Sequence, residues 1–243
     1  LVMEYVDGLN LKDHLNVREN PFSIKDTVQL LMPICSALVE IHQAGLLHRD
    51  IKPANIIRYE RADGRAGVKL VDFGIARKQE DLGLTSDGYV VGTPQYLSPE
   101  VLLGKKHSDA SDVYALGITL CELATNTRPF DGKELHDIIK NRTEGTLVLP
   151  APLEGTALGK LVTHMLAKKD AERPTAKEVL TGLEAVYADL ADFRSDLAEA
   201  NTVGIRSATR KTSHEIVGPS VLGRTPQKPP NNPPSDPVRT QGI

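Results

Sequence analysis

Aromatic residues are scarce in this chain of 243 residues: tryptophan is absent, and there are only four phenylalanines and six tyrosines. A folded core must therefore be built mainly from aliphatic side chains. Cysteine is also scarce, because Cys35 and Cys121 are the only two, and both lie within apolar helical patterns. They predict buried, reduced thiols rather than a disulfide framework or a cysteine-rich metal site.

Long apolar runs are absent as well. The longest nearly apolar run, over residues 113–121, is far shorter than the ~20 residues needed to cross a bilayer. No signal peptide opens the chain. The net charge of −3 is too small to indicate nucleic acid or a membrane surface as a partner. These absences predict a cytoplasmic protein without a membrane segment in this chain, or a piece cut from a larger one.

The first residues resemble the middle of a core more than the beginning of a domain. The chain opens on Leu1 instead of methionine, and residues 1–6 have the pattern of a buried strand, followed by a turn signal at Asp7-Gly8. Because natural domains seldom start inside a core, we expect a fragment of a longer polypeptide.

A helix with one buried face is predicted from Ser23 to Gly45. Pro33 lies inside this stretch and should bend it or mark its first turns. The apolar residues that recur at helical spacing are Val28, Leu31, Ile34, Cys35, Leu38 and Ile41. After the helix, two short apolar runs at 56–57 and 68–71 enclose the turn signal Asp63-Gly64, which predicts a hairpin.

The second half of the chain is predicted to be helical after a long loop. Residues 75–97 are rich in Gly, Thr, Ser and Asp, and a loop of that length is usually functional or disordered. Segment 200–243 is dominated by Pro, Ser, Thr, Asn and basic residues, so it cannot bury enough apolar surface to offset its ordering entropy, and we expect it to be disordered. The predicted helices cover residues 110–124, 132–142, 156–168 and 175–199. The fold class is therefore mainly α with small β elements.

Two polar clusters carry the chemistry. The sequence H-R-D-I-K-P-A-N at 48–55 lies between a helix and a strand, and D-F-G at 72–74 follows a strand. Either one alone is an ordinary polar turn. Together, two carboxylates and an amide at one cleft suit Mg²⁺, which prefers hard oxygen ligands. Asn55 and Asp72 could hold the metal, while Asp50 orients a hydroxyl and Lys52 offsets charge on a moving phosphoryl group.

These motifs, with S-P-E at 98–100, resemble the signature of the eukaryotic-type (Hanks-type) serine/threonine protein kinases, in particular their bacterial members. The resemblance covers about residues 1–185. It implies a partial α+β kinase fold, with the hinge and the C-terminal lobe over residues 1–190, the N-terminal lobe missing, and a disordered tail at 200–243. It also implies transfer of phosphate from ATP, with Mg²⁺, to Ser and Thr hydroxyls of protein substrates.

The resemblance gives each motif residue a role. Asp50 matches the catalytic aspartate, and Lys52 matches the lysine that contacts the γ-phosphate. Asn55 and Asp72 match the two metal-binding positions, and all three of Lys52, Asn55 and Asp72 would contact the nucleotide. The segment M-E-Y-V at 3–6 resembles the hinge that binds adenine.

At this hinge the backbone groups of Glu4 and Val6 would bind adenine, with Met3 as the gatekeeper. Ile57 would lie under the adenine ring. Met3 and Ile57 could equally be plain core residues, since the floor of such a pocket is also core.

The stretch G-T-P-Q-Y-L-S-P-E at 92–100 resembles the peptide-docking end of a kinase activation segment. Thr93 would hydrogen-bond toward the catalytic aspartate and lysine. Arg49 implies an anion that orders the activation loop, and phosphorylated Thr85 is the first candidate and Ser86 the second. The alternative is that both are ordinary polar loop residues.

Three further residues are predicted to be architectural by the same resemblance. Glu100 and Arg173 match a buried ion pair, and a buried charge needs its partner. Asp112 matches the aspartate of a central helix that braces the catalytic loop.

Several kinase parts are absent from the sequence. In the family a glycine-rich loop and a lysine–glutamate pair precede the hinge, and no G-x-G-x-x-G occurs in this chain. We therefore expect negligible activity from residues 1–243 alone. A noncatalytic pseudokinase or scaffold is the main alternative, but the four catalytic positions are retained. A small-molecule phosphotransferase of the aminoglycoside-kinase type would lack the G-T-P…S-P-E stretch.

Overall fold

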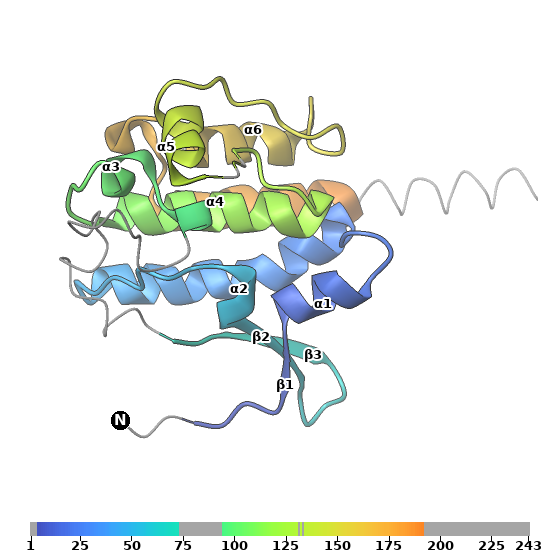
Figure 1. Cartoon of the computed structure of the whole chain (residues 1–243). Helices are drawn as coiled ribbons and strands as arrows, with labels where there is room; N and C mark the ends of the chain where they lie inside the picture. The colour runs from blue at the N-terminus through green and yellow to red at the C-terminus, as the bar shows by residue number, and fades with distance from the viewer. Residues whose placement is uncertain (1–3, 73–93, 131, 133, 192–243) are drawn as a thin grey trace, which may run out of the picture. The chain divides into compact units, whose positions relative to one another are not determined.

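The computed structural model describes residues 4–72, 94–130, 132 and 134–191 (Figure 1). The chain divides into two units, Leu1–Leu197 and Ala198–Ile243, and all described residues belong to the first. The predicted tail over 200–243 therefore lies outside the described residues, as does most of the predicted loop over 75–97.

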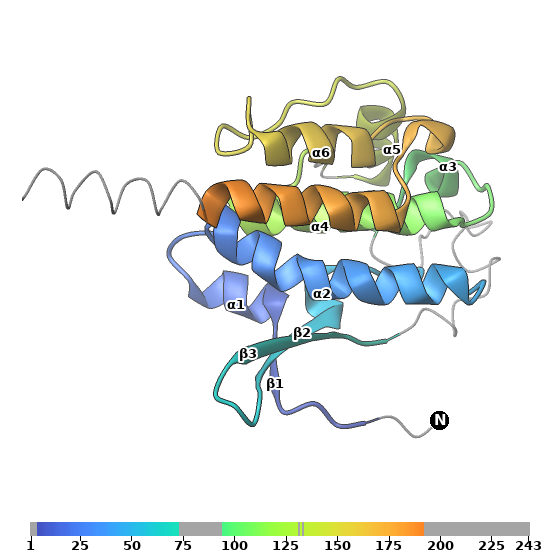
Figure 2. The same ribbon diagram turned by 180° about the vertical axis from the view of Figure 1, so that it is seen from behind.

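A central helix, α4 (Asp109–Thr125), organises the first unit, and 14 of its 17 residues are buried. Such a helix, apolar nearly all round, is stable only when other elements cover every side of it. Figures 1 and 2 show one group of helices on each side of α4, and the helix over residues 176–191 running beside it. One group contains α1 (Leu11–Val17) and α2 (Ile24–Gln43), and the other contains α3 (Pro99–Leu102), α5 (Leu135–Thr143) and α6 (Ala157–Met165). Short 3₁₀ turns occur at Pro53–Asn55, Pro94–Tyr96 and Asp170–Glu172.

A small antiparallel sheet lies on the α1–α2 side, in the order β1 (Gly8–Asn10), β2 (Ile56–Glu60), β3 (Ala66–Leu70). The predicted hairpin around Asp63-Gly64 is confirmed. Its turn is closed by the Arg61 N–H, which donates to the Arg65 carbonyl at 2.8 Å. Gly64 has a φ of 75°, a left-handed conformation that glycine adopts without strain.

The prediction of a strand over 1–6 with a turn at Asp7-Gly8 is wrong for the described residues. Residues 4–6 are irregular, and the strand begins at Gly8. A Cβ at Gly8 would lie 2.4 Å from the Arg58 carbonyl oxygen, so glycine serves close strand pairing here instead of a turn. The sequence analysis also missed α1, which follows directly because the Asn10 side chain accepts a hydrogen bond from the Asp13 N–H at 2.9 Å.

The predicted helix after Ser23 is confirmed as α2. The Ser23 hydroxyl accepts a hydrogen bond from the Asp26 N–H at 3.1 Å, and Gly45, with a φ of 69°, follows the last turn. Five of the six predicted core residues are buried, and Ile41 is partly buried. Pro33 lies in the interior of the helix, and the axis of α2 changes direction part way along (Figures 1 and 2).

The later predicted helices are confirmed with small shifts in their ends. The pattern at 110–124 corresponds to α4, that at 132–142 to α5, and that at 156–168 to α6. The pattern at 175–199 is helical from 176 to 191, the last described residue. Cys35 and Cys121 are free and buried, and burial raises the pKa of each thiol to about 12. Within the described ranges, no helix has the length and apolar character that a membrane span requires.

Candidate active site

The loop over 48–55 is held in place by a buried carboxylate from α4. Asp112 is fully buried, and its two oxygens accept the backbone N–H groups of His48 at 2.8 Å and Arg49 at 2.9 Å. The ring of His42 on α2 also contacts Asp112, at 3.1 Å. Burial alone would raise the pKa of Asp112, but these three hydrogen bonds outweigh it and lower the pKa. The first turn of α4 thereby fixes the start of the loop.

This attachment matters because the loop adopts a costly backbone conformation. Arg49 has a φ of 67°, in the left-handed region that costs a non-glycine residue roughly 1–2 kcal/mol. The hydrogen bond to Asp112 helps to hold Arg49 in this conformation. The Nε of Arg49 is buried and has no hydrogen-bond partner among the described residues.

Three predicted catalytic side chains meet directly. The Nδ2 of Asn55 donates to the backbone oxygen of Asp50 at 2.7 Å and to its Oδ2 at 2.9 Å. The Nζ of Lys52 donates to the same Oδ2 at 3.0 Å, and the side chains of Lys52 and Asp50 are each 15% exposed. The 3₁₀ turn Pro53–Asn55 brings Asn55 back over Asp50. The carboxylate of Asp50 is thus held by the cation of Lys52 and the amide of Asn55. A carboxylate fixed in this way could accept a hydrogen bond from a polar substrate.

Asp72 is attached to the same group through the residue before it. The Val71 N–H donates to the Asn55 carbonyl at 2.9 Å, and the Val71 carbonyl lies 3.2 Å from the His48 Nε2. Asp72 follows with a φ of 57° and an exposed side chain. The end of β3 is therefore bonded to both ends of the loop that carries Asp50, which places Asp72 beside that loop.

The sequence analysis gave His48 no role of its own. The structure shows that His48 is fully buried and joins the loop to the end of β3, and burial lowers the pKa of its imidazole. A neutral ring fits this position, because it can donate to the Val71 carbonyl without a buried charge. The available signal was its place at the start of the H-R-D motif.

The donor set fits a magnesium ion. Asp72 offers an exposed carboxylate, and both of the Asn55 bonds to Asp50 are donated by Nδ2, so they do not use its amide oxygen. Hard oxygen donors in small number, with room for water, are what Mg²⁺ requires.

Two of the predicted hinge residues, Glu4 and Val6, are described, and they precede β1. Glu4 is exposed and Val6 half-buried. The Glu4 carboxylate accepts from the Lys69 Nζ at 2.6 Å, and Lys69 is the cross-strand neighbour of Ile57. The structure thus links Glu4 to the strand pair that contains the half-buried Ile57. Other predicted site residues lie outside the described residues, namely Met3, Thr85, Ser86 and Thr93.

Glu100 and Arg173 form a two-pronged ion pair. The Arg173 guanidinium donates to the two Glu100 oxygens at 2.8 and 2.7 Å, and the Ser111 hydroxyl donates to Glu100 at 2.8 Å. Both charged residues are buried. Burial would raise the pKa of Glu100, but hydrogen bonds and the positive charge of Arg173 lower it to about 2. The pair ties α3 to the start of α4 and to the turn before the 176–191 helix.

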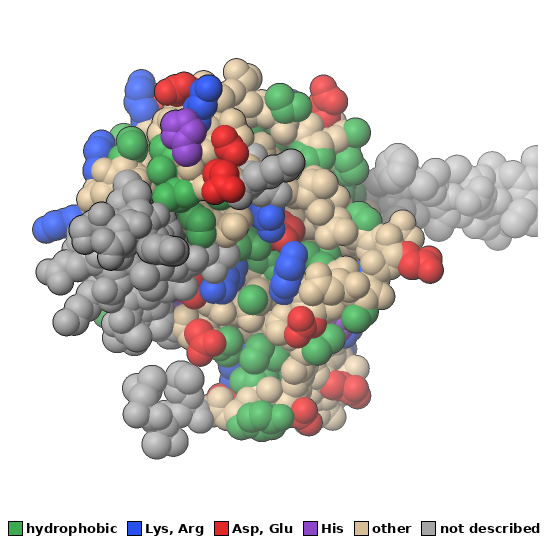
Figure 3. Space-filling model, viewed as in Figure 1, with side chains coloured by type: hydrophobic (Ala, Val, Ile, Leu, Met, Phe, Trp, Pro, Cys, Tyr) green, Lys and Arg blue, Asp and Glu red, His purple; other side chains and the backbone are tan. Residues whose placement is uncertain are grey.

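A second charge cluster, formed around the buried carboxylate of Glu122, was not predicted. Glu122, near the end of α4, accepts from Lys12 at 2.8 Å, from Arg128 at 3.2 Å and from the Tyr96 hydroxyl at 2.5 Å. It joins α1 to the 3₁₀ turn that contains Tyr96. Figure 3 shows acidic and basic side chains interspersed over the described part of the face that is seen in Figure 1.

With this geometry in place, comparison with known proteins gives the family. The profile described as a protein kinase domain matches residues 1–182. The chain therefore belongs to the protein kinase family, as the motif resemblance predicts.

The relatives narrow this to bacterial serine/threonine kinases. The chain is 38% identical over 193 residues to the serine/threonine-protein kinase PknB of Mycobacterium tuberculosis, covering 77% of this chain and 30% of that protein. It is 35% identical over 193 residues to a protein named probable serine/threonine-protein kinase PknB from Corynebacterium glutamicum, covering 75% and 29%. It is 33% identical over 246 residues to the serine/threonine-protein kinase pkn3 of Myxococcus xanthus, covering 97% and 42%. The chain thus spans less than half the length of these curated relatives.

Proposed function

We propose that this chain supplies the catalytic machinery for transfer of the γ-phosphate of ATP to Ser and Thr hydroxyls of protein substrates. The observation that carries the proposal is the hydrogen-bonded group of Asp50, Lys52 and Asn55, with Asp72 attached through Val71. Such transfer depends mainly on positioning and electrostatic stabilisation, because its transition state is loose. A rigidly braced loop that presents one carboxylate and one cation suits that task.

In the proposed reaction, Asp50 accepts a hydrogen bond from the substrate hydroxyl, orients its oxygen toward the phosphorus and takes up its proton. Lys52, at 3.0 Å from Asp50, balances negative charge that develops on the transferred group. Asn55 keeps Asp50 in place and, together with Asp72, would hold Mg²⁺. When bound, Mg²⁺ neutralises charge on the ATP phosphates.

The binding of adenine is proposed for the segment around Met3, Glu4 and Val6, with Ile57 below the ring. Support comes from the position of Glu4 beside the strand pair that contains Ile57. A cytoplasmic location is proposed with it, because ATP is a cytoplasmic reagent and the two cysteines are free thiols.

Control of the site is proposed to involve Arg49. Its buried Nε has no partner among the described residues, and a phosphate on Thr85, or on Ser86, would supply charge-assisted acceptors for it. Thr93 is proposed to bond toward Asp50 and Lys52.

Activity should require parts that the sequence does not contain. We expect residues 1–243 alone to transfer negligible phosphate to a mixed Ser/Thr peptide library, because the sequence has no G-x-G-x-x-G, and in the family the glycine-rich loop and the lysine–glutamate pair precede the hinge. A polypeptide in which such a segment precedes residue 1 should be active. The measurement is ³²P incorporation from labelled ATP, with phosphoamino-acid analysis.

The library should be assayed beside hydroxylated small molecules. Phosphate on peptide Ser and Thr supports the proposal. If the extended polypeptide labelled only the small molecules, or labelled no acceptor at all, the proposed protein kinase activity would be contradicted. A rate for residues 1–243 equal to that of the extended polypeptide would refute the dependence on the missing parts.

A further inference from the structure

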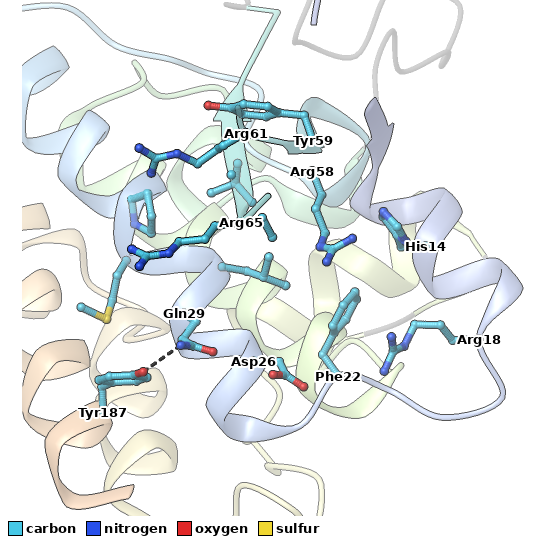
Figure 4. A pocket seen from close by; sticks show the side chains of 16 residues that line it. His14, Arg18, Phe22, Asp26, Gln29, Arg58, Tyr59, Arg61, Arg65 and Tyr187 are labelled. Carbon is cyan, nitrogen blue, oxygen red and sulfur yellow. Dashed lines mark hydrogen bonds between the residues drawn. The ribbon is translucent and has the colours of Figure 1, made fainter. Parts of the chain in front are cut away.

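A cavity of about 830 Å³ lies away from the loop over 48–55. It is bounded by α1, the first half of α2, the β2–β3 hairpin and the helix over 176–191 (Figure 4). None of the residues proposed for catalysis or nucleotide binding lines it. Its volume is in the upper part of the range of roughly 300–1,000 Å³ for ligand pockets.

The rim of this cavity is strongly basic. Four arginines line it, all exposed, namely Arg18, Arg58, Arg61 and Arg65. Figure 4 shows Arg58 directed toward Phe22, while Arg61 and Arg65 lie on the other side, nearer to Gln29 and Tyr187. Among the described residues, no carboxylate forms an ion pair with Arg58 or Arg65, whereas Arg61 has a long contact of 3.9 Å with Asp63.

Little negative charge balances these arginines within the cavity. Asp26 is the one carboxylate that lines it, and its Oδ2 already accepts from the Ser23 hydroxyl at 2.8 Å at the start of α2. Burial lowers the pKa of the His14 imidazole, and the positive charges of Arg58 and Arg18 lower it further, whereas Asp13 raises it. The cavity therefore favours an anionic ligand.

The floor is apolar, which a small inorganic anion cannot use. Phe22 is buried and lies under the Arg18 guanidinium, 4.4 Å from the ring centre. Apolar atoms continue along the floor through Leu30, Met32, Pro33 and Val68. A ligand that matches both the basic rim and the apolar floor carries acidic groups and large apolar side chains close together.

The hairpin adds a strand edge. In the described sheet β3 is an outer strand, and its residues Ala66, Gly67 and Val68 line the cavity. An outer strand offers backbone N–H and C=O groups to an added extended segment. A peptide can use the edge, the apolar floor and the basic rim at once.

The chain's own C-terminal segment is a poor match for this cavity. Residues 198–243 contain six Lys and Arg against three Asp and Glu, so the segment is basic like the rim. We propose that the cavity binds an acidic peptide segment, with leucine or aromatic residues between its carboxylates, from a partner protein. This docking site shares no lining residue with the proposed phosphoryl-transfer site. The docking proposal can therefore be tested independently of that activity.

The test uses residues 1–243 and fluorescein-labelled synthetic peptides, with binding read by fluorescence anisotropy. One peptide alternates Glu with Leu and Phe, a second has Lys in place of Glu, and a third has Ser in place of Leu and Phe. We expect measurable binding of the first peptide only, and binding should weaken as salt increases because the rim is exposed.

The variant R58E/R65E should weaken binding of the first peptide by about tenfold or more, since each attraction becomes a repulsion. The matched control is K140E/K160E, which changes net charge equally on exposed residues of α5 and α6, on the other side of α4. It should leave the affinity within about twofold. Circular dichroism checks that both variants are folded, and R58Q/R65Q replaces the first variant if it is not.

Three results would overturn the proposal. The first peptide could bind the wild type and the arginine variant equally. The Ser-containing peptide or inorganic phosphate could compete as well as the first peptide, which would indicate a simple anion site. Vesicles of phosphatidylcholine and phosphatidylserine could bind more tightly than the peptide with the same arginine dependence, which would indicate a membrane surface.

Discussion

Replacing Asp50 by Asn is expected to lower kcat for peptide phosphorylation by about 10²–10⁴-fold, the usual contribution of a positioned acid–base group. Asparagine has the same shape but cannot take up the proton of the substrate hydroxyl. It also removes the charged acceptor that Lys52 and Asn55 share at 3.0 and 2.9 Å. The KM for ATP should change little, because Asp50 is not proposed to touch the nucleotide. The measurement is steady-state kinetics with the extended polypeptide.

The matched control is Asp189→Asn, an exposed carboxylate on the 176–191 helix. It should keep kcat near that of the wild type. If Asp50→Asn retained kcat within about twofold, the role given to Asp50 in positioning and proton uptake would be wrong.

Replacing Arg173 by Ala is expected to lower the free energy of unfolding by about 3–5 kcal/mol, because it leaves Glu100 as a buried, unpaired charge. The Arg173 guanidinium also donates to three backbone carbonyls, those of Ala110, Ala167 and Lys168, which would lose this donor. Urea unfolding followed by circular dichroism measures the loss.

The double variant Glu100→Gln/Arg173→Met separates the charge effect from packing. Removing both charges should cost less than removing Arg173 alone, since no unpaired charge remains. If the double variant lost as much stability as Arg173→Ala or more, the stranded charge would not be the cause.

The same pair should make stability depend on acid pH. The folded-state pKa of Glu100 is lowered from 4.5 to about 2, so its contribution is fully present above about pH 4.5 and is lost as pH falls toward 2. In Arg173→Ala this part of the pH dependence should disappear.

The sequence was most informative where local patterns decide structure. The helical spacing after Ser23 and the turn at Asp63-Gly64 predicted α2 and the hairpin, because capping and turn residues act within a few positions. The four residues Asp50, Lys52, Asn55 and Asp72 were predicted from two motifs, each of which specifies residue types and spacing together, and their catalytic roles stay a prediction.

The failures came from contacts between distant parts of the chain. Gly8 has the composition of a turn, but its role is set by close approach of the Arg58 backbone, 50 residues away. Likewise, nothing near Glu122 indicates that Lys12 and Tyr96 converge on it. The basic cavity is also assembled from segments that local patterns do not relate, so sequence analysis gave no sign of it.

The most direct test of the magnesium-centred site is the Mg²⁺ dependence of ATP binding, measured by titration calorimetry on the extended polypeptide. We expect Mg²⁺ to tighten ATP binding in the wild type. Asp72→Asn and Asn55→Ala should each require about 10–100-fold more Mg²⁺ for the same effect. The control Asp63→Asn, an exposed carboxylate in the hairpin turn, should behave as the wild type. An unchanged Mg²⁺ response in both site variants would contradict the account.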